Sequence, residues 1–155
     1  MKNFLILVCM SLAFVSCKVE QETFSYTLFT NTTQHDISVR PYYIGVIEPD
    51  LAFTLSPAET KKVSVTSHGG LGDGVCYDTS LSTCDSVLVV FDDSLSVVHY
   101  KINFTGSAAR FYPYSSLRNL YNIQSYRRNV INESRHSREV EFTYVFTESD
   151  YTGLK

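Results

Sequence analysis

Apolar and polar side chains alternate through most of this 155-residue chain beyond its N-terminal segment. A period of two places apolar side chains on one face of a β-strand, whereas a helix would repeat them every 3.6 residues. The pattern predicts an all-β chain of about seven strands. These are Phe24 to Leu28, Ile37 to Val39, Leu51 to Leu55, Val63 to Val65, Val87 to Phe91, Val98 to Ile102 and Val140 to Phe146.

Residues that favour turns separate these segments, among them Pro49 and the pair Asp92-Asp93. Ser86 to Phe91 is apolar on both faces and is expected to be a central strand. Leu95 to Ile102 would return beside it as a hairpin across Asp92-Asp93. About seven short strands separated by tight turns are typical of an antiparallel β-sandwich, Ig-like or transthyretin-like.

One stretch, residues 115–130, breaks the period of two. Its apolar residues fall at helical spacing after Ser115-Ser116, so a short helix or an irregular crossover fits there. The tail from Glu148 to Tyr151 follows the last strand and is expected to fray. Because a domain usually has about 100–200 residues, we expect a single sandwich domain at residues 23–155.

The first sixteen residues have the layout of an export signal, with a positive start, an apolar run and a small residue before Cys17. The run is too short to cross a membrane, which needs roughly twenty residues of helix. Ala13-Phe14-Val15-Ser16-Cys17 resembles the bacterial lipobox, whose cysteine receives lipid. We therefore predict a lipoprotein signal peptide at residues 1–16, a palmitate-type anchor on Cys17 and a tether over residues 17–22. A plain secretory signal is the alternative.

The residues after the cysteine indicate the destination. Lys18 is not the aspartate that resembles an inner-membrane retention signal in enteric lipoproteins, which favours the outer membrane. Val19-Glu20-Gln21-Glu22 looks like the acidic surface-export tag of Bacteroides-type lipoproteins, with its acids interrupted. The chain is expected to be lipid-anchored to the outer membrane. The periplasmic face and the cell surface both remain open.

The folded part contains two of the four cysteines, because Cys9 lies in the signal and Cys17 is the lipid acceptor. In an exported chain, the remaining pair, Cys76 and Cys84, predicts one disulfide. A two-cysteine metal site is disfavoured because no histidine lies within ligand spacing of either residue. We expect no metal and no cofactor.

Charge is small overall and unevenly distributed. The formal net charge of −3 gives no basic field for a polyanion and argues against nucleic acid as a partner. Residues 105–138 hold six arginines and one acid. Guanidinium groups suit carboxylates and phosphates, so these arginines could recognise an anion. Alternatively they pair internally with Glu139, Glu141 and Glu148.

The same stretch supplies the expected ligand face. Residues 106–126 break the strand period, carry positive charge and concentrate aromatic residues, and loops on rigid scaffolds often carry function. An exposed aromatic and arginine surface would suit a glycan or a protein partner, although the absence of tryptophan weakens the glycan interpretation. The residues of this predicted face are Arg110, Tyr112, Tyr114, Arg118 and, just beyond the segment, Arg127.

No catalytic motif is visible. Gly-x-Ser-x-Gly, Ser-x-x-Lys and His-Glu-x-x-His, which mark common hydrolases, are absent. The four histidines are dispersed, and His99 is expected on the solvent face of a strand. His68 to Gly74 is interpreted as a flexible loop rather than a calcium repeat. The chain is predicted to be non-enzymatic; the alternative is a small secreted hydrolase whose triad is not visible as a motif.

The lipobox, the strand from Asp85 to Asp93 and Phe142-Thr143-Tyr144 before an acidic end look like the small β-sandwich lipoproteins of Bacteroides-type bacteria. Most of these have no assigned activity, so the resemblance implies location and architecture: a lipid-anchored binding or structural module of unknown ligand. Two Asp-Ser-aliphatic triplets also resemble O-glycosylation acceptors of these bacteria. Ser94 is favoured because it sits in a turn, whereas Ser86 opens a buried strand.

Overall fold

The computed structural model describes residues 22–69, 83–102 and 110–153, with the side chains of residues 64–69 left out. Several sequence predictions lie outside the described residues. These are the signal at residues 1–16, the lipid site Cys17, the cysteine Cys76 and most of the glycine-rich loop. They stay predictions.

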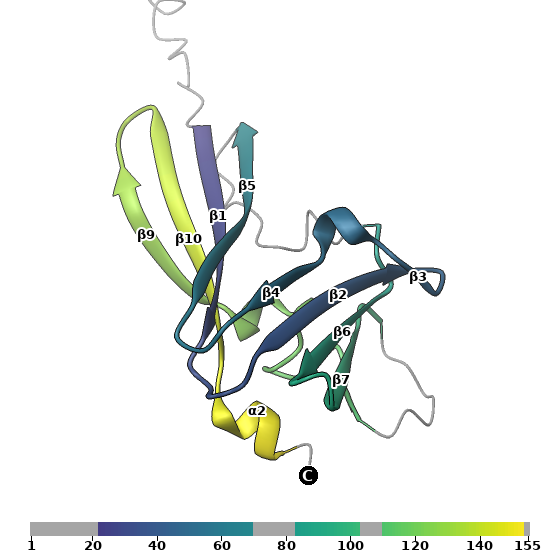
Figure 1. The fold of residues 1–155 in the computed structure, drawn as a ribbon. Coiled ribbons are helices and arrows are strands. Elements are labelled where there is room, and N and C mark those ends of the chain that lie inside the picture. The colour runs from purple at the N-terminus through teal and green to yellow at the C-terminus, as the bar shows by residue number, and fades with distance from the viewer. Residues whose placement is uncertain (1–21, 70–82, 103–109, 154–155) are drawn as a thin grey trace, which may run out of the picture.

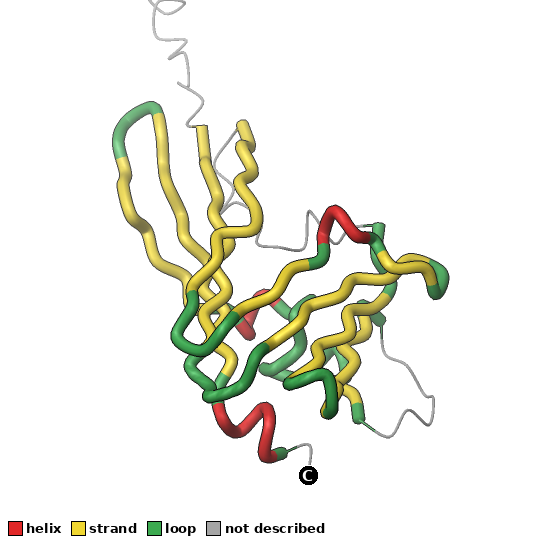
Figure 2. The backbone as a smooth tube through the Cα atoms, viewed as in Figure 1, coloured by secondary structure: helices red, strands yellow, loops and turns green. Residues whose placement is uncertain are grey.

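The described residues form two β-sheets (Figures 1 and 2). The first sheet has the strand order β5 (Thr60–Gly69), β1 (Glu22–Asn31), β10 (Ser137–Phe146) and β9 (Arg127–Glu133). The second has the order β3 (Val46–Ile47), β2 (Ile37–Tyr43), β6 (Ser86–Phe91), β7 (Leu95–Tyr100) and β8 (Phe111–Tyr112), with β4 (Phe53–Leu55) also paired to β2. Short helical segments are η1 (Pro49–Leu51), η3 (Ile123–Ser125) and α2 (Glu148–Thr152). The architecture is an open two-sheet arrangement consistent with the predicted β-sandwich.

Burial follows the alternation seen in the sequence. In β1 every second side chain from Thr23 to Asn31 is buried, and β10 alternates in the same way from Val140 to Phe146. Phe29 lies at the centre of this core, with its ring centroid 5.1 Å from that of Phe53 and 5.9 Å from that of Tyr144. Each predicted segment overlaps a strand of the structure. The alternation therefore identifies the strands because it records which face is removed from water.

The sheets are not purely antiparallel, which corrects the sequence prediction. β1 and β10, the first and last strands, pair in parallel at the centre of their sheet. β7 and β8 are also parallel. Alternation tells which side chains share a face, but both strand directions give the same alternation. The sequence pattern therefore carries no information on this point.

Three of the ten described strands are not among the seven predicted ones: β3, β8 and β9. β3 and β8 have only two residues each. β9 is long, but six of its seven residues are exposed and the seventh is half-buried. An edge strand with solvent on both faces leaves no apolar alternation, and charged residues are common on such edges.

The predicted hairpin between β6 and β7 is confirmed, with Phe91 opposite Leu95. Asp92 and Asp93 form its turn, and both have positive φ angles, 48° and 53°. Two consecutive residues in the left-handed region are typical of the tight turns that suit twisted hairpins, and aspartate tolerates this region better than most residues.

Of residues 115–130, those from 115 to 126 form an irregular crossover rather than an α-helix, and the rest belong to β9. The crossover consists of turns and the short η3, and it leads into β9 at Arg127. Leu120, Tyr121 and Tyr126 of this crossover are buried in the core. The crossover therefore closes the sandwich with its own apolar side chains.

The tail does not fray, which corrects the sequence prediction for Glu148 to Tyr151. Residues 148–152 form α2, which begins with a capping box: the Thr147 side chain caps the backbone of Asp150, and the Asp150 side chain accepts from the Thr147 N–H. Asp150 is only 2% exposed. A buried carboxylate needs hydrogen-bond or ion-pair partners, and these partners hold the tail in place.

No helix in the described part of the chain is long and apolar enough to cross a membrane.

Candidate functional site

The five residues of the predicted ligand face do not form one exposed surface in the structure. Tyr114 and Arg127 are exposed, whereas Arg110, Tyr112 and Arg118 are half-buried. Tyr114 follows β8 of the six-stranded sheet, and Arg127 begins β9 of the other sheet. The five residues therefore come from different parts of the sandwich.

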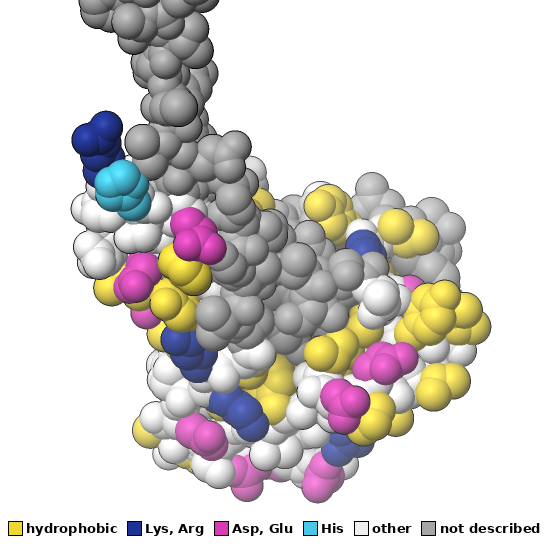
Figure 3. Space-filling model, turned by 90° about the horizontal axis from the view of Figure 1, so that it is seen from above, with side chains coloured by type: hydrophobic (Ala, Val, Ile, Leu, Met, Phe, Trp, Pro, Cys, Tyr) yellow, Lys and Arg dark blue, Asp and Glu magenta, His cyan; other side chains and the backbone are white. Residues whose placement is uncertain are grey.

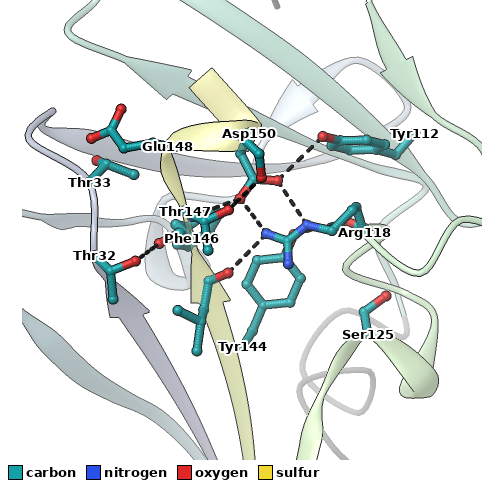
Figure 4. A network of polar contacts seen from close by, with 12 residues as sticks. Thr32, Thr33, Tyr112, Arg118, Ser125, Tyr144, Phe146, Thr147, Glu148 and Asp150 are labelled. Carbon is teal, nitrogen blue, oxygen red and sulfur yellow. Dashed lines mark hydrogen bonds and ion pairs between the residues drawn. The ribbon is translucent and has the colours of Figure 1, made fainter. Parts of the chain in front are cut away.

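Arg118 and Tyr112 belong to an internal polar network around Asp150 (Figure 4). Arg118 Nε donates to Asp150 Oδ1 over 2.8 Å, and Arg118 Nη2 forms an ion pair with Asp150 Oδ2. Nη2 also donates to the carbonyl oxygen of Val145 over 2.9 Å, and the guanidinium lies 4.7 Å from the ring centroid of Tyr144. The Tyr112 hydroxyl donates to Asp150 Oδ1 over 3.3 Å.

This network is architectural. It joins the crossover (Arg118), the six-stranded sheet (Tyr112) and α2 (Asp150) through directed bonds. Burial and the neighbouring Asp150 raise the pKa of Tyr112, so its phenol stays protonated and donates. Arg118 thus pairs internally, as one sequence interpretation holds, but its partner is Asp150 rather than Glu139, Glu141 or Glu148.

His99 is buried at 1% exposure, which corrects its expected place on a solvent face. Along β7 it follows the inward-facing Val97 at the next alternate position. Its Nδ1 accepts a hydrogen bond from the backbone N–H of Leu120 over 3.1 Å. Burial, with a smaller contribution from Arg118, lowers the pKa of His99 to about 3. The imidazole is therefore neutral and serves to anchor the crossover.

A groove of about 650 Å³ lies on the outer face of the second sheet. Its lining combines outward-facing residues of β2, β4 and β6 with the core residues Ile37 and Leu55. Asp36 before β2, Ser56 after β4 and the β6–β7 turn complete it. The lining residues are Asp36, Ile37, Ser38, Arg40, Thr54, Leu55, Ser56, Val90, Asp92 and Asp93. The groove thus offers carboxylates, hydroxyls and one guanidinium beside the apolar residues Ile37, Leu55 and Val90.

The Arg40 side chain is held across this groove. Its Nε donates to the hydroxyl of Ser38 over 2.9 Å, and its Nη2 donates to Asp93 Oδ1 over 3.2 Å. Ser38 and Arg40 lie on the same face of β2 two residues apart, which is what the period of two requires. The guanidinium is therefore positioned by the fold before any ligand arrives.

Asp92, which also lines the groove, is held in place by two hydrogen bonds. Its Oδ2 lies 2.5 Å from His35 Nδ1, and its Oδ1 accepts from the backbone N–H of Asp36 over 2.9 Å. These hydrogen bonds, that of His35 first, lower the pKa of Asp92. The imidazole ring of His35 also stacks on Tyr151 of α2, with ring centroids 3.6 Å apart. Its Nε2 faces Glu148 Oε2 at 3.7 Å.

Both imidazole nitrogens of His35 thus face carboxylates, so the ring acts as a clamp between the β6–β7 turn and α2. A general base would need a nitrogen directed at the substrate. The described residues contain no cluster of three or more His, Cys, Asp or Glu side chains arranged to hold a metal ion. The arrangement is suited to binding a polar ligand.

The other predicted sites are the disulfide cysteines and the two serines that resemble glycosylation acceptors. Cys84 is buried, while its expected disulfide partner Cys76 lies outside the described residues. Ser94 is exposed in the β6–β7 turn, and Ser86 is half-buried with its hydroxyl donating to Asp85 over 2.7 Å. The disulfide and the glycosylation sites stay predictions.

Sequence reasoning did not identify the groove residues Asp36 and Arg40 or the clamp residue His35. A signal existed in part, because Ser38 and Arg40 occupy the polar positions of the alternation in β2. That signal gives the face of the strand, but the pairing of β2 with β6 is needed to bring Asp93 beside Arg40.

Comparisons with protein-family models, with curated proteins and with solved structures find no match to this chain.

Proposed function

We propose that the protein is a non-enzymatic binding module, held at the outer membrane by lipid on Cys17, and that the groove beside β2 is its ligand site. The proposal moves the ligand site away from residues 106–126. Two of the five residues predicted there, Tyr112 and Arg118, are already engaged with Asp150, which leaves fewer groups available for a ligand.

The single observation that carries the proposal is the charge of the preformed groove. Three carboxylates, of Asp36, Asp92 and Asp93, line it with one guanidinium, of Arg40. Arg40 is paired with Asp93, and Asp92 is paired with the neighbouring His35, so the excess of negative charge in the groove lies at Asp36. Such a groove favours a ligand that carries positive charge and donates hydrogen bonds. We therefore propose a basic segment of a protein partner as the ligand.

A glycan is the weaker candidate. Protein sites for sugars commonly use aromatic stacking surfaces, and none of the residues that line the groove is aromatic. The hydroxyls of Ser38, Thr54 and Ser56 would serve a peptide equally well, because they accept and donate hydrogen bonds.

The orientation of His35 supports a non-enzymatic role. Its two nitrogens are directed at Asp92 and Glu148, whereas a hydrolase would direct one of them at a nucleophile. The lipid anchor is supported by the sequence before Cys17, and Lys18 after it favours the outer membrane.

Binding is tested with the mature lipidated protein in detergent and a fluorescein-labelled lysine-rich peptide, followed by fluorescence anisotropy. Asp36→Asn should weaken binding about two- to five-fold, the size expected for one exposed ion pair. The control Asp50→Asn removes the same charge from η1, outside the lining of the groove, and should leave binding unchanged. Equal weakening by both variants, or equal binding of a glutamate-rich peptide, would contradict the proposal.

The anchor is tested by Cys17→Ser and cell fractionation. The protein should leave the membrane fraction, because a lipid-borne attachment is lost with its acceptor. A variant that stays with the membrane as before would show that the anchor is not lipid on Cys17.

A further inference from the structure

The β2–β3 hairpin presents apolar side chains to solvent. Ile44 is 74% exposed and Val46 is 64% exposed, and their neighbours Tyr43 and Ile47 are also exposed. Single exposed apolar residues are common, but a group of four at the tip of one hairpin is a patch that indicates an interaction.

The turn itself is unusual for a hairpin in water. Ile44 and Gly45 both have positive φ, 50° and 76°, and turns of this kind favour Asn, Asp or Gly at both positions. A β-branched residue is disfavoured in the left-handed region. The chain nevertheless places isoleucine at the most exposed point of the patch, so the side chain has a use outside the fold.

The tip is rigid although it is exposed. Asp85 accepts a hydrogen bond from the backbone N–H of Ile44 over 2.8 Å. Tyr43 pairs with Val46 across the turn, and the N–H of Glu48 donates to the carbonyl oxygen of Pro41 over 2.9 Å. Backbone groups that are already bonded can enter an apolar environment at lower cost.

We propose that this tip inserts into the surface of the membrane that holds the lipidated N-terminus. The inference rests on the proposed anchor at Cys17. Cys17 is five residues from Glu22, where β1 begins, and five extended residues span at most about 18 Å. The start of β1 is then held close to the bilayer.

The tip lies on a flank of the molecule and is open to the end at which β1 begins. Figure 3 views the molecule from above, the end at which Figure 1 places the start of β1. Hydrophobic side chains gather at the right of this view, where Figure 1 places β3. In Figure 1 the β2–β3 hairpin lies to the right of the start of β1 and below it, so a membrane surface inclined to β1 would meet both the tether and the tip.

The composition of the tip favours lipid over a second copy of the chain. A stable dimer buries about 800 Å² per partner, and four side chains at a hairpin tip present much less. Residues 42–47 are two tyrosines, three aliphatic residues and a glycine, and tyrosine with apolar side chains is typical of the membrane interface. Glu48 and Asp85 flank the tip, so attraction to anionic lipid does not drive insertion.

The chain contains no tryptophan, so one introduced tryptophan reports on a chosen position. The Val46→Trp variant of the lipidated protein is reconstituted in phosphatidylcholine vesicles, with or without brominated lipid. We expect a blue-shifted emission and at least two-fold quenching by the brominated lipid. The matched control is Leu117→Trp, which replaces a side chain of similar exposure, 62%. Its neighbour Arg118 contacts α2, at the end opposite the start of β1 (Figure 1), so it should be neither shifted nor quenched.

Flotation of the vesicles separates the two proposals. Protein that fails to float with the vesicles contradicts the anchor. Protein that floats while Val46→Trp is unquenched contradicts insertion of the tip and leaves the anchor intact. A blue shift without quenching would show that a second protein copy, rather than lipid, covers the tip and would also overturn the inference.

Discussion

Replacing Arg118 by alanine should be far more destabilising than replacing Arg40, although each arginine forms one ion pair. Arg118→Ala removes two hydrogen bonds to Asp150, one to the carbonyl oxygen of Val145, and the contact with the Tyr144 ring. Asp150 is left in the interior, with its side chain 3% exposed. Removing one partner of a buried pair costs about 3–5 kcal/mol.

Two features reduce this figure. The Arg118 side chain is one-third exposed, at 32%. Asp150 also keeps the Thr147 N–H at 2.8 Å and the Tyr112 hydroxyl. We therefore expect Arg118→Ala to lower the free energy of unfolding by about 2–3 kcal/mol.

Urea denaturation followed by circular dichroism measures this difference. The control Arg40→Ala breaks a pair with Asp93, whose side chain is 88% exposed, and should cost less than about 1 kcal/mol. Equal losses for the two variants would refute the reasoning that Asp150 and Arg118 tie the crossover to α2. A larger loss for Arg40→Ala would refute it as well.

Three further predictions concern separate parts of the molecule. Ile44→Asn should raise the free energy of unfolding by about 1 kcal/mol, because asparagine tolerates the left-handed region better, and urea titration checks this. The pKa of His99 is about 3 in the folded protein against the ordinary value of 6.5, so its contribution to stability is fully present above pH 6.5 and is lost as the pH falls towards 3. His99→Gln should therefore make the free energy of unfolding, measured by urea titration, depend less on pH between 6.5 and 3. Cys76 and Cys84 should be found linked by mass spectrometry of the unreduced mature protein, and two alkylatable thiols would contradict the disulfide.

The strands could be predicted from the sequence because burial imposes alternation. Phe29 and Phe142 face the core, whereas Glu141, the polar neighbour of Phe142, is only half-buried. Thr27, on the other side of Leu28 from Phe29, shows the limit of judging burial by polarity, because it is buried although it is polar. Small hydroxyls fit beside the large aromatic side chains of β10, where Thr27 lies opposite Phe142. Alternation therefore identifies inward positions more reliably than residue polarity does.

The rest depends on contacts between distant residues. Arg118 and Asp150 are 32 positions apart, and no periodicity links them. The tail was expected to fray because it follows the last strand, but a capping box and one buried ion pair stabilise α2. The position of Asp93 beside Arg40 likewise follows from the pairing of β2 with β6, which sequence alone does not reveal.

The most direct test of the binding proposal is a map of backbone amide shifts. Isotope-labelled protein is titrated with the lysine-rich peptide, and ¹H–¹⁵N spectra are recorded. The proposal predicts the largest shifts at Ser38, Thr54 and Val90, which lie in the groove. Shifts centred on Tyr114 and Arg127, with the groove unchanged, would contradict it.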